Sequence, residues 1–267
     1  MNDYEIIDTT PDNILACSLC GYKHLTNLGY RRKAGWLKQR YPEGLRYKVL
    51  RSKKDGDIGM IEYVPGEHSW RPVAARGYLV IHCLMVNRRH ADRGLGSLLL
   101  DTCLRDAKKN QCRGVAVVTS SGSFMAKRDL FIKSGFVPVA SSPPCELLVK
   151  KFNQRAPDPG FIVNRDALLK KCRHGLTILA ADQCPLVPKW VDDIVAVSKT
   201  LKLKAKVVRV TSAGASRKLP TPYGMFSIIY KGTLIAGRPV SATRFRLIMK
   251  KIGQPASPPT RCPVLAE

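Results

Sequence analysis

The amino-terminal half of the chain alternates between apolar spacings that are typical of helices and apolar runs of strand length. Helical spacing covers residues 11–19, 25–41, 97–110 and 126–134. Strand-like runs cover residues 45–52, 58–64, 77–86, 114–120, 136–139 and 146–152. The run "GVAVVTS" is continuously apolar, which predicts a central strand covered on both faces. The order predicts helices, then antiparallel strands, then strand, loop, helix, strand, helix and two strands.

The carboxy-terminal half has its own pattern, with elements expected at residues 176–181, 187–201, 204–210, 225–230, 233–237 and 242–252. Its order of strand, helix, three strands and helix predicts a second, smaller α/β domain around one core. Between the halves, "NQRAPDPGF" holds two prolines and a glycine, which is typical of a linker. We therefore expect a first domain at 1–152, a linker at 153–160, a second domain at 161–252 and a Pro-rich tail at 253–267.

The net charge is strongly positive. The 267 residues include 45 Lys and Arg against 20 Asp and Glu, a formal net charge of +25. The part after Asn153 carries 20 basic and 6 acidic side chains, against 25 and 14 up to that residue. An apolar content of 45% excludes disorder of the whole chain. The surplus charge indicates an anionic partner, with nucleic acid ahead of a membrane surface.

The lack of a recognisable targeting signal in this sequence and its cysteine usage lead us to expect a cytoplasmic protein. The apolar runs are shorter than the ~20 residues of a membrane span, and the start "MNDYEIIDTT" is acidic, unlike a secretion signal. We expect no membrane partner. Nine cysteines without framework spacing indicate reduced thiols. The spacing Cys17-x-x-Cys20 is half of a zinc site without a matching second half, so no metal is expected.

The segment "LMVNRRHADRGLGSLLL" carries the most specific chemistry. A strand ends at Val86, and a loop with Gly94 and Gly96 leads directly into an apolar helix. Glycines allow a ligand close to the backbone, and a helix start offers free N–H groups and partial positive charge. The loop therefore predicts a site for phosphate or pyrophosphate, although an ordinary tight turn explains the same spacing. It follows an antiparallel strand and has no downstream acid for a ribose, so it is not a dinucleotide fold.

With this loop and the later "FIKSGF", residues 1–152 resemble the GNAT superfamily of N-acyltransferases. The resemblance is closest to a bacterial subgroup, the YoaP-like type, that shares "GMIEYVPGEHSWRPV" and carries a small carboxy-terminal domain. It implies an α/β (α+β) fold, a mixed sheet flanked by helices, in which the loop holds the pyrophosphate of coenzyme A. The implied donor-binding residues are Leu84, Val86, Arg93, Gly94, Leu95, Gly96 and Ser97.

Some positions depart from the family pattern. Ala91 replaces the usual basic or glutamine residue before the first glycine, which leaves Arg93 as the main cation of the loop. Phe124 and Phe131 stand where many members have an asparagine and a tyrosine, and that tyrosine often protonates the leaving thiolate. Val80 stands where histone-type members have a glutamate base. These departures put ordinary acetyl transfer from coenzyme A in doubt.

Acid–base candidates flank the expected cleft. Such chemistry moves one proton off the amine and one onto the leaving group. The candidate catalytic residues are Glu62, Glu67, His82 and Ser120. Each candidate also has a structural alternative to catalysis. For each glutamate it is a salt bridge with an arginine, for the histidine a place in the core, and for the serine an ordinary loop hydroxyl. Trp36, Tyr63 and Trp70 are expected to line the acceptor pocket, with core packing as the alternative.

The second domain resembles a thioredoxin-like fold without its redox chemistry. "LTILAADQCPLVPKW" is similar to the strand and helix start of that fold, and "LPTPYGMFSIIYKG" to its partner segment. Val187 occupies the place of a second cysteine, so disulfide exchange by a resident pair is excluded. Cys184 keeps the alternative of a low-pKa thiol at a helix start. We expect this domain to bind RNA instead, with Arg88 and Arg89 of the first domain. The expected RNA-binding residues are Arg88, Arg89, Lys199, Lys202, Lys204, Lys206, Arg209, Arg244, Arg246, Lys250 and Lys251.

Three functions fit these observations. The favoured one is an acyltransferase that takes its donor from aminoacyl-tRNA and forms an amide on a small-molecule amine. The second is an acetyl-CoA- or acyl-CoA-dependent N-acetyltransferase. The third is a non-catalytic RNA-binding protein. The first is favoured because a charge of +25 is hard to explain for an enzyme that uses coenzyme A. No tightly bound cofactor is expected, and the chain is expected to be a monomer or weak dimer.

Overall fold

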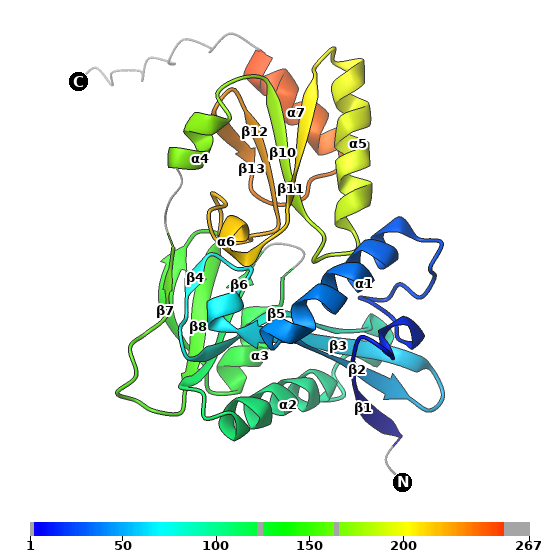
Figure 1. The fold of residues 1–267 in the computed structure, drawn as a ribbon, viewed down its shortest axis with the longest axis vertical. Coiled ribbons are helices and arrows are strands. Elements are labelled where there is room, and N and C mark those ends of the chain that lie inside the picture. The colour runs from blue at the N-terminus through cyan, green and yellow to red at the C-terminus, as the bar shows by residue number, and fades with distance from the viewer. Residues whose placement is uncertain (1–2, 122–124, 163–165, 254–267) are drawn as a thin grey trace, which may run out of the picture.

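The computed structural model describes residues 3–121, 125–162 and 166–253. Its larger part is a mixed seven-stranded sheet in the order β1-β2-β3-β5-β6-β8-β7 (Figure 1). All neighbours in this sheet are antiparallel except β5 and β6. The strands are β1 (Tyr4–Asp8), β2 (Arg46–Ser52), β3 (Gly56–Pro65), β5 (Tyr78–Val86), β6 (Gly114–Ser120), β7 (Val137–Ser142) and β8 (Cys145–Lys151). The predicted α/β class, a mixed sheet flanked by helices, is confirmed.

Strands β5 and β6 diverge about halfway along their length. Their pairing runs only from Tyr78 opposite Gly114 to Ile81 opposite Val117. The next residue, His82, is an extra residue in β5 where its register against β3 shifts. Such a bulge bends a strand and increases its twist. The two strands therefore diverge beyond Ile81 and Val117.

The two faces of the sheet are covered by different elements (Figure 1). Helices α2 (Leu95–Lys109) and α3 (Arg128–Lys133) cover one face. Helix α1 (Leu28–Arg40) and the carboxy-terminal part of the chain cover the other. Helix α2 buries a stripe of residues that are three or four apart, which fixes its orientation. This stripe consists of Leu95, Leu99, Leu100, Cys103, Leu104 and Ala107.

The carboxy-terminal part forms a second unit around a four-stranded sheet in the order β11-β10-β12-β13. Strand β10 is parallel to β11 and antiparallel to β12. The elements are β10 (Leu176–Ala181), α5 (Val187–Thr200), β11 (Ala205–Val210), α6 (Ala213–Ser216), β12 (Phe226–Tyr230), β13 (Thr233–Ala236) and α7 (Ala242–Gly253). Their order agrees with the predicted order of strands and helices, while the thioredoxin-like assignment stays a prediction.

Smaller elements join these two units. Strand β4 (Val73–Ala74) pairs with β9 (Gly160–Phe161), so the start of the second expected domain lies on the surface of the first. Helix α4 (Asp166–Lys171) precedes β10. The remaining turns are the 3₁₀ segments η1 (Ile14–Ala16), η2 (Tyr41–Glu43), η3 (Gly66–His68) and η4 (Arg88–His90). The predicted tail lies outside the described residues from residue 254 onward.

The two units share one apolar core. A single cluster of buried side chains contains Trp36 and Trp70 of the first unit together with Tyr223 and Phe226 of the second. Each of these four side chains is at least 94% buried. The two units are therefore packed against each other through one apolar cluster, while the predicted domain and linker bounds stay a prediction.

The predicted helix at 11–19 is wrong, and strand β1 was not predicted. Only the turn η1 forms there, because Thr10 and Asn13 bind nearby backbone groups that a helix would use: the Asn13 side chain accepts from Thr10 N and donates to Asp8 O. Strand β1 lies at the edge of the sheet and pairs with β2 alone. Its five residues carry too short a pattern to be distinguished from an irregular start.

Candidate active site

The diverging half of β5 and the start of α2 lie next to each other in the chain. Leu84 and Val86 pack toward α2, and Cys83 and Met85 face α1 and the second unit. From His82 onward, β5 pairs with β3 alone among the described strands, so its edge toward β6 is free of ladder bonds. An open strand edge of this kind offers backbone N–H groups to a ligand that enters between the strands.

The loop after β5 forms a helix start that suits an anion. Gly94 has a φ of 70° and is the N-cap of α2, with no side-chain cap and no acid in the first turn. Arg93 is exposed beside it and forms no ion pair within the described residues. Free N–H groups and a nearby cation favour phosphate at this position.

The two glycines of the loop have different structural reasons. A side chain on Gly94 would point into open space, so its left-handed conformation is what favours glycine there. A Cβ on Gly96 would meet Leu130 Cδ2 at 3.3 Å, so packing against α3 already limits that position. The role of Gly96 in binding a donor stays a prediction.

Four side chains form a buried polar network on the other face of the sheet. Glu62 of β3 is fully buried and accepts hydrogen bonds from Lys33 of α1 and from Gln183 Nε2 of the second unit, the latter at 2.8 Å. His82 Nδ1 lies 3.0 Å from the same carboxylate. The network therefore joins α1, the sheet and the second unit.

Charge in this network is balanced by geometry. Burial alone would raise the pKa of the Glu62 carboxyl, but Lys33 and the bond from His82 outweigh it and lower that pKa to about 2. Burial lowers the pKa of His82 despite the neighbouring carboxylate. His82 Nε2 accepts from the backbone N–H of Trp70 at 3.0 Å, so a neutral ring with its proton on Nδ1 satisfies both contacts.

Arg71 is a second buried cation at the interface, and it has no carboxylate partner among the described residues. Its side chain is 2% exposed and donates to the backbone carbonyls of Tyr223 and His82. Its Nε has no hydrogen-bond partner in the described part of the chain. Ser216 Oγ of the second unit also donates to the carbonyl of Trp70. Sequence patterns did not single out Lys33, Arg71 or Gln183.

The other predicted acid–base residues lie apart from this network. Glu67 Oε1 accepts from Gly77 N at 2.9 Å, at the opposite end of β5 from the diverging half. Ser120 lies at the end of β6, where the strands have separated, and it contacts the side chain of Cys145. The structure therefore brings Glu62 and His82 together and separates Glu67 from them.

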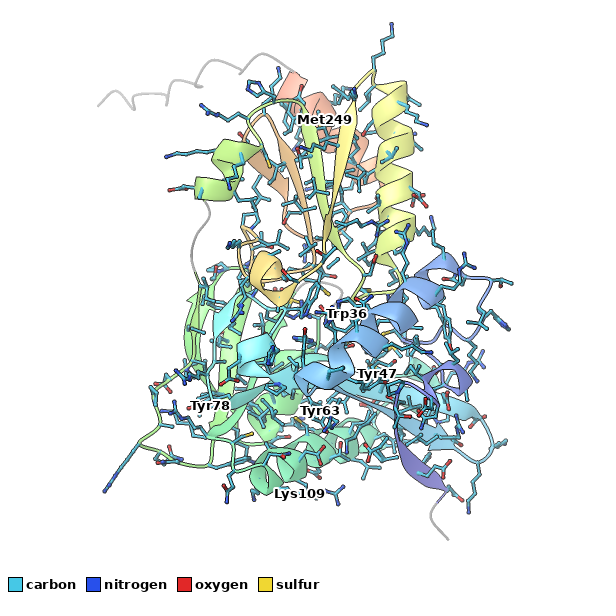
Figure 2. All side chains as sticks on the ribbon, in the orientation of Figure 1. Trp36, Tyr47, Tyr63, Tyr78, Lys109 and Met249 are labelled. Atoms are coloured by element: carbon cyan, nitrogen blue, oxygen red, sulfur yellow. The ribbon has the colours of Figure 1, made fainter. Side chains whose placement is uncertain are left out.

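The three aromatic residues expected in an acceptor pocket do not share one. Trp36 and Trp70 lie edge to face with ring centroids 5.1 Å apart, on the face of α1 and the second unit. Tyr63 packs under α2 on the other face, and its hydroxyl donates to Asp106 (Figure 2). Alternation along β3 explains this, because Glu62 and Tyr63 are neighbours and so point to opposite faces.

Cysteines gather beside the buried network. Cys20, Cys83 and Cys184 come from three segments and influence one another's ionisation. Burial is the main cause that raises the pKa of Cys184 well above its ordinary value, so the alternative of a low-pKa thiol there is not supported. Among the described residues, no group of three or more His, Cys, Asp or Glu has an arrangement that could hold a metal ion.

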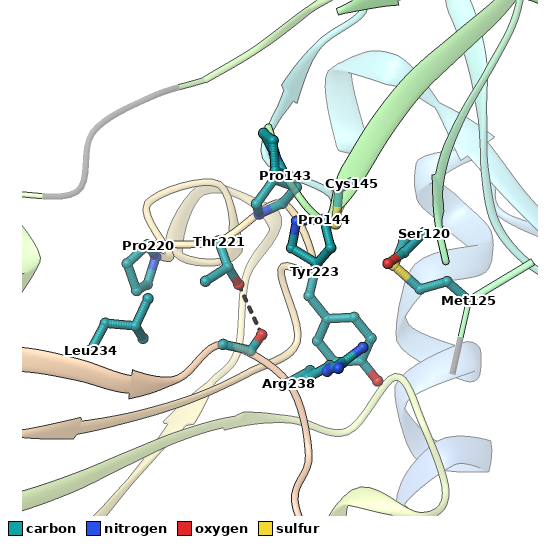
Figure 3. A pocket seen from close by; sticks show the side chains of 12 residues that line it. Ser120, Met125, Pro143, Pro144, Cys145, Pro220, Thr221, Tyr223, Leu234 and Arg238 are labelled. Carbon is teal, nitrogen blue, oxygen red and sulfur yellow. Dashed lines mark hydrogen bonds between the residues drawn. The ribbon is translucent and has the colours of Figure 1, made fainter. Parts of the chain in front are cut away.

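A cavity of about 340 Å³ opens where the two units meet (Figure 3). The first unit contributes Ser120 of β6 and, around the turn between β7 and β8, Cys145 and two prolines. The second unit contributes the segment 220–223 and, after β13, Arg238. The hydroxyl of Tyr223 is buried and has no hydrogen-bond partner among the described residues. The sequence predicted neither Tyr223 nor Arg238 as site residues, although "LPTPYGMF" had marked this segment as distinctive.

The predicted RNA-binding residues are mostly exposed cations. All of them are exposed except Arg209, which is half-buried and donates to Asp182 at 2.6 Å. Lys199 lies in the last turn of α5, with Lys202–Lys206 just after it, and Lys250 and Lys251 lie in the last turn of α7. These helix ends are at the end of the second unit that is remote from the sheet of the first (Figure 1). Their RNA-binding role stays a prediction. No helix in the described ranges is long and apolar enough to span a bilayer.

Comparisons with known proteins support the family resemblance. Residues 23–136 match the model of the Acetyltransferase (GNAT) family. Over 252 residues the chain is 26% identical to "Uncharacterized N-acetyltransferase YoaP" of Bacillus subtilis (strain 168), covering 92% of this chain and 96% of that protein. The similarity to YoaP thus extends through both units.

Solved structures of acetyltransferases align with part of this chain. An acetyltransferase of the GNAT family from Staphylococcus aureus Mu50 has a TM-score of 0.42 at 10% identity, over 56% of this chain and 99% of that one. The structure of yncA from Salmonella typhimurium with its cofactor acetyl-CoA has a TM-score of 0.42 at 15% identity, over 59% and 99%.

Proposed function

We propose that the protein is an N-acyltransferase that uses acetyl-CoA or another acyl-CoA as donor. One observation carries this proposal: β5 diverges from β6 after Ile81, and the short loop 87–94 joins the free half of β5 to the start of α2, which has no side-chain cap. A strand edge with free N–H groups and a helix start that suits phosphate thus lie at the two ends of one short segment. This arrangement matches a donor with a pyrophosphate at one end and an acyl group at the other. The Acetyltransferase (GNAT) match over residues 23–136 and the name of the relative YoaP support the same donor.

The residues of this chain divide the work as follows. The N–H groups at the start of α2 and Arg93 hold the diphosphate, and Leu84 and Val86 border the gap between the strands. Free N–H groups of β5 polarise the acyl carbonyl. They stabilise the negative charge that grows on its oxygen in the transition state. The donor supplies an activated acyl group for attack by an amine.

Proton transfer involves Ser120, and Glu62 and His82 have a positioning role. Glu62 is ionised at neutral pH, but its low pKa and its bonds to Lys33 and Gln183 make it a weak base. We assign Glu62 and His82 a positioning role: their hydrogen bonds hold α1 and the second unit in place over the diverging strands. Ser120, at the end of β6 and on the wall of the cavity, is the proposed residue for passing a proton to the leaving thiolate.

A second donor, aminoacyl-tRNA, is supported by one observation: the second unit has exposed cations, such as Lys202, Lys204 and Lys206, that form no ion pair among the described residues. Its binding would release counterions, so log affinity would fall with log salt at about −0.9 per duplex phosphate contact. Acyl-CoA is the better-supported donor, because the family match and YoaP's name concern acetyltransferases.

One assay separates the two donors. The purified protein is offered acetyl-CoA or a pool of aminoacylated tRNAs with a panel of amines, in parallel with and without RNase. We expect release of coenzyme A thiol that is insensitive to RNase. Deacylation of tRNA that RNase abolishes, with no thiol release from acetyl-CoA, would replace acyl-CoA by aminoacyl-tRNA as donor.

A further inference from the structure

The cavity between the units opens onto the end of β6 where the two strands have separated. Ser120, the last residue of β6, forms part of its wall. Its volume of about 340 Å³ lies at the lower end of small-molecule sites and is too small for a macromolecule. A molecule held here would lie beside the gap that the proposed donor occupies.

The charges around this cavity are of one sign. Among the described residues that line it, none is acidic, and the lining residue Arg238 forms no ion pair with any of the described residues. Behind the wall, the guanidinium of Arg71 lies 5.4 Å from the ring centroid of Tyr223, which itself lines the cavity. Arg71 is bonded to backbone carbonyls, whereas the charge of Lys33 is balanced by Glu62. A buried cation without a counter-charge favours an anion nearby.

The rest of the wall is apolar. Met125, Pro144, Pro222 and Leu234 surround the space between the two units. In Figure 3 the prolines and Leu234 lie on one side, Ser120 and Met125 on the other, and Tyr223 and Arg238 between them. The cavity thus combines an apolar lining with one cationic end.

We infer that this cavity is the acceptor site and that it takes amines which carry a carboxylate on an apolar body, the class of the apolar α-amino acids. This inference rests on the proposed acyl transfer. Arg238 binds the carboxylate, the apolar wall takes the side chain, and the amine points to the gap between β5 and β6. The neutral amine attacks the acyl carbon, so a C–N bond forms and the C–S bond of the thioester breaks. The proton that the attacking nitrogen loses is passed through the Ser120 hydroxyl to the leaving thiolate. Polycationic amines are excluded by the charge of the site.

The test compares acids with their amides. L-Leucine and L-phenylalanine, and the amide of each, are assayed as acceptors with acetyl-CoA by release of coenzyme A thiol. We expect the acids to be acylated with a KM at least about 10-fold below that of the amides, the loss typical of one charge-assisted hydrogen bond. Arg238→Gln should raise the KM of the acids by a similar factor and leave the KM of the amides unchanged. Arg238→Lys should restore part of the difference.

Arg155→Gln is the matched control, because Arg155 is also exposed but lies in the segment between the units and does not line the cavity. It should leave both KM values unchanged. Amides that serve as well as acids, or acids whose KM ignores Arg238, would overturn the carboxylate site. Equilibrium dialysis of radiolabelled leucine and phenylalanine without donor tests the site separately from turnover. Binding that Arg238→Gln abolishes, with no acyl-CoA consumed by any amine, would refute acyl transfer and retain the site. Absence of both binding and turnover of the acids would refute the site.

Discussion

The two faces of the seven-stranded sheet bury different kinds of side chain. Under α2 and α3 the contacts are mainly apolar. The charged cluster described there joins the buried Lys48 to Asp8 and Asp106, and it opens to solvent at Asp8, whose side chain is 69% exposed. Under α1 and the second unit, Lys33, Glu62, Arg71 and His82 are all at least 96% buried. Buried charges cost free energy that apolar residues would not.

This difference identifies the face where arrangement matters as much as stability. An apolar face tolerates small shifts between its layers, whereas a hydrogen-bonded pair of charges is satisfied in one geometry only. The bonds from Gln183 to Glu62, from Arg71 to Tyr223 and from Ser216 to Trp70 all cross between the units. They fix the second unit over the diverging strands and so set the shape of the cavity.

The largest effect is expected from removing one partner of the buried ion pair. Lys33→Met leaves the Glu62 carboxylate buried without its main counter-charge, and should lower the free energy of unfolding by about 3–5 kcal/mol. Urea denaturation measures this loss. The double variant Lys33→Met/Glu62→Gln should recover most of it, because no unpaired charge remains. A double variant as unstable as the single one would contradict the importance of charge on this face.

On the apolar face the same size of loss should come without any such rescue. Leu99→Ala removes a fully buried side chain between α2 and the sheet, and should cost about 2–5 kcal/mol. Combining it with Glu62→Gln should give additive losses, since the two residues lie on opposite faces. A strong coupling measured by urea denaturation would show that the faces are not independent.

A smaller effect is expected at the loop before α2. Arg93→Ala should weaken acetyl-CoA binding by about 1–3 kcal/mol, since it removes one charge-assisted bond to phosphate. Arg105→Ala, an exposed arginine further along α2, is the matched control and should leave binding unchanged. Isothermal titration measures both. Equal effects of the two variants would indicate general charge attraction in place of a defined site.

The smallest effect concerns acid. Because the pKa of His82 is lowered in the folded protein, the unfolded chain binds the proton more readily, and stability should fall as pH drops below the usual histidine value near 6.5. The loss is at most about 1.4 kcal/mol per pH unit, hence at most about 2 kcal/mol at pH 5. Below about pH 4.5, Glu62 takes up a proton in the unfolded chain but not in the folded protein, where its pKa is about 2, and this adds to the loss of stability.

Unfolding of the wild type and of His82→Gln between pH 7 and pH 5 checks this. The stability difference between the two proteins should shrink toward pH 5. A constant difference would mean that His82 is not kept neutral by its surroundings.

Local patterns predicted much of the fold. The continuous apolar run at 114–120 is the central strand β6, and the glycine loop does precede an amphipathic helix. Alternation along β3 is also a local feature, and it places Glu62 and Tyr63 on opposite faces of the sheet. These features depend on residues that are close together in the sequence, so the spacing of apolar residues is enough to predict them.

The candidate site was less predictable because its contacts are distant in sequence. Gln183 bonds to Glu62 across 121 residues, and Arg71 to Tyr223 across 152. No local spacing marks such pairs. The bulge at His82 is equally silent in the sequence, since one extra residue in a strand leaves its apolar pattern nearly unchanged.

The apolar core shared by the two units has a consequence for how the chain is made. The last residue of that core, Phe245, leaves the ribosome about 175 residues after Trp70, on the order of ten seconds or more later at about 5–20 residues per second. During that interval only α1 covers this face of the nascent sheet, and the aromatic and charged side chains that pack against the second unit stay exposed. We therefore expect a premature stop anywhere in the second unit to give a product that is prone to aggregate, because part of this apolar face would stay exposed.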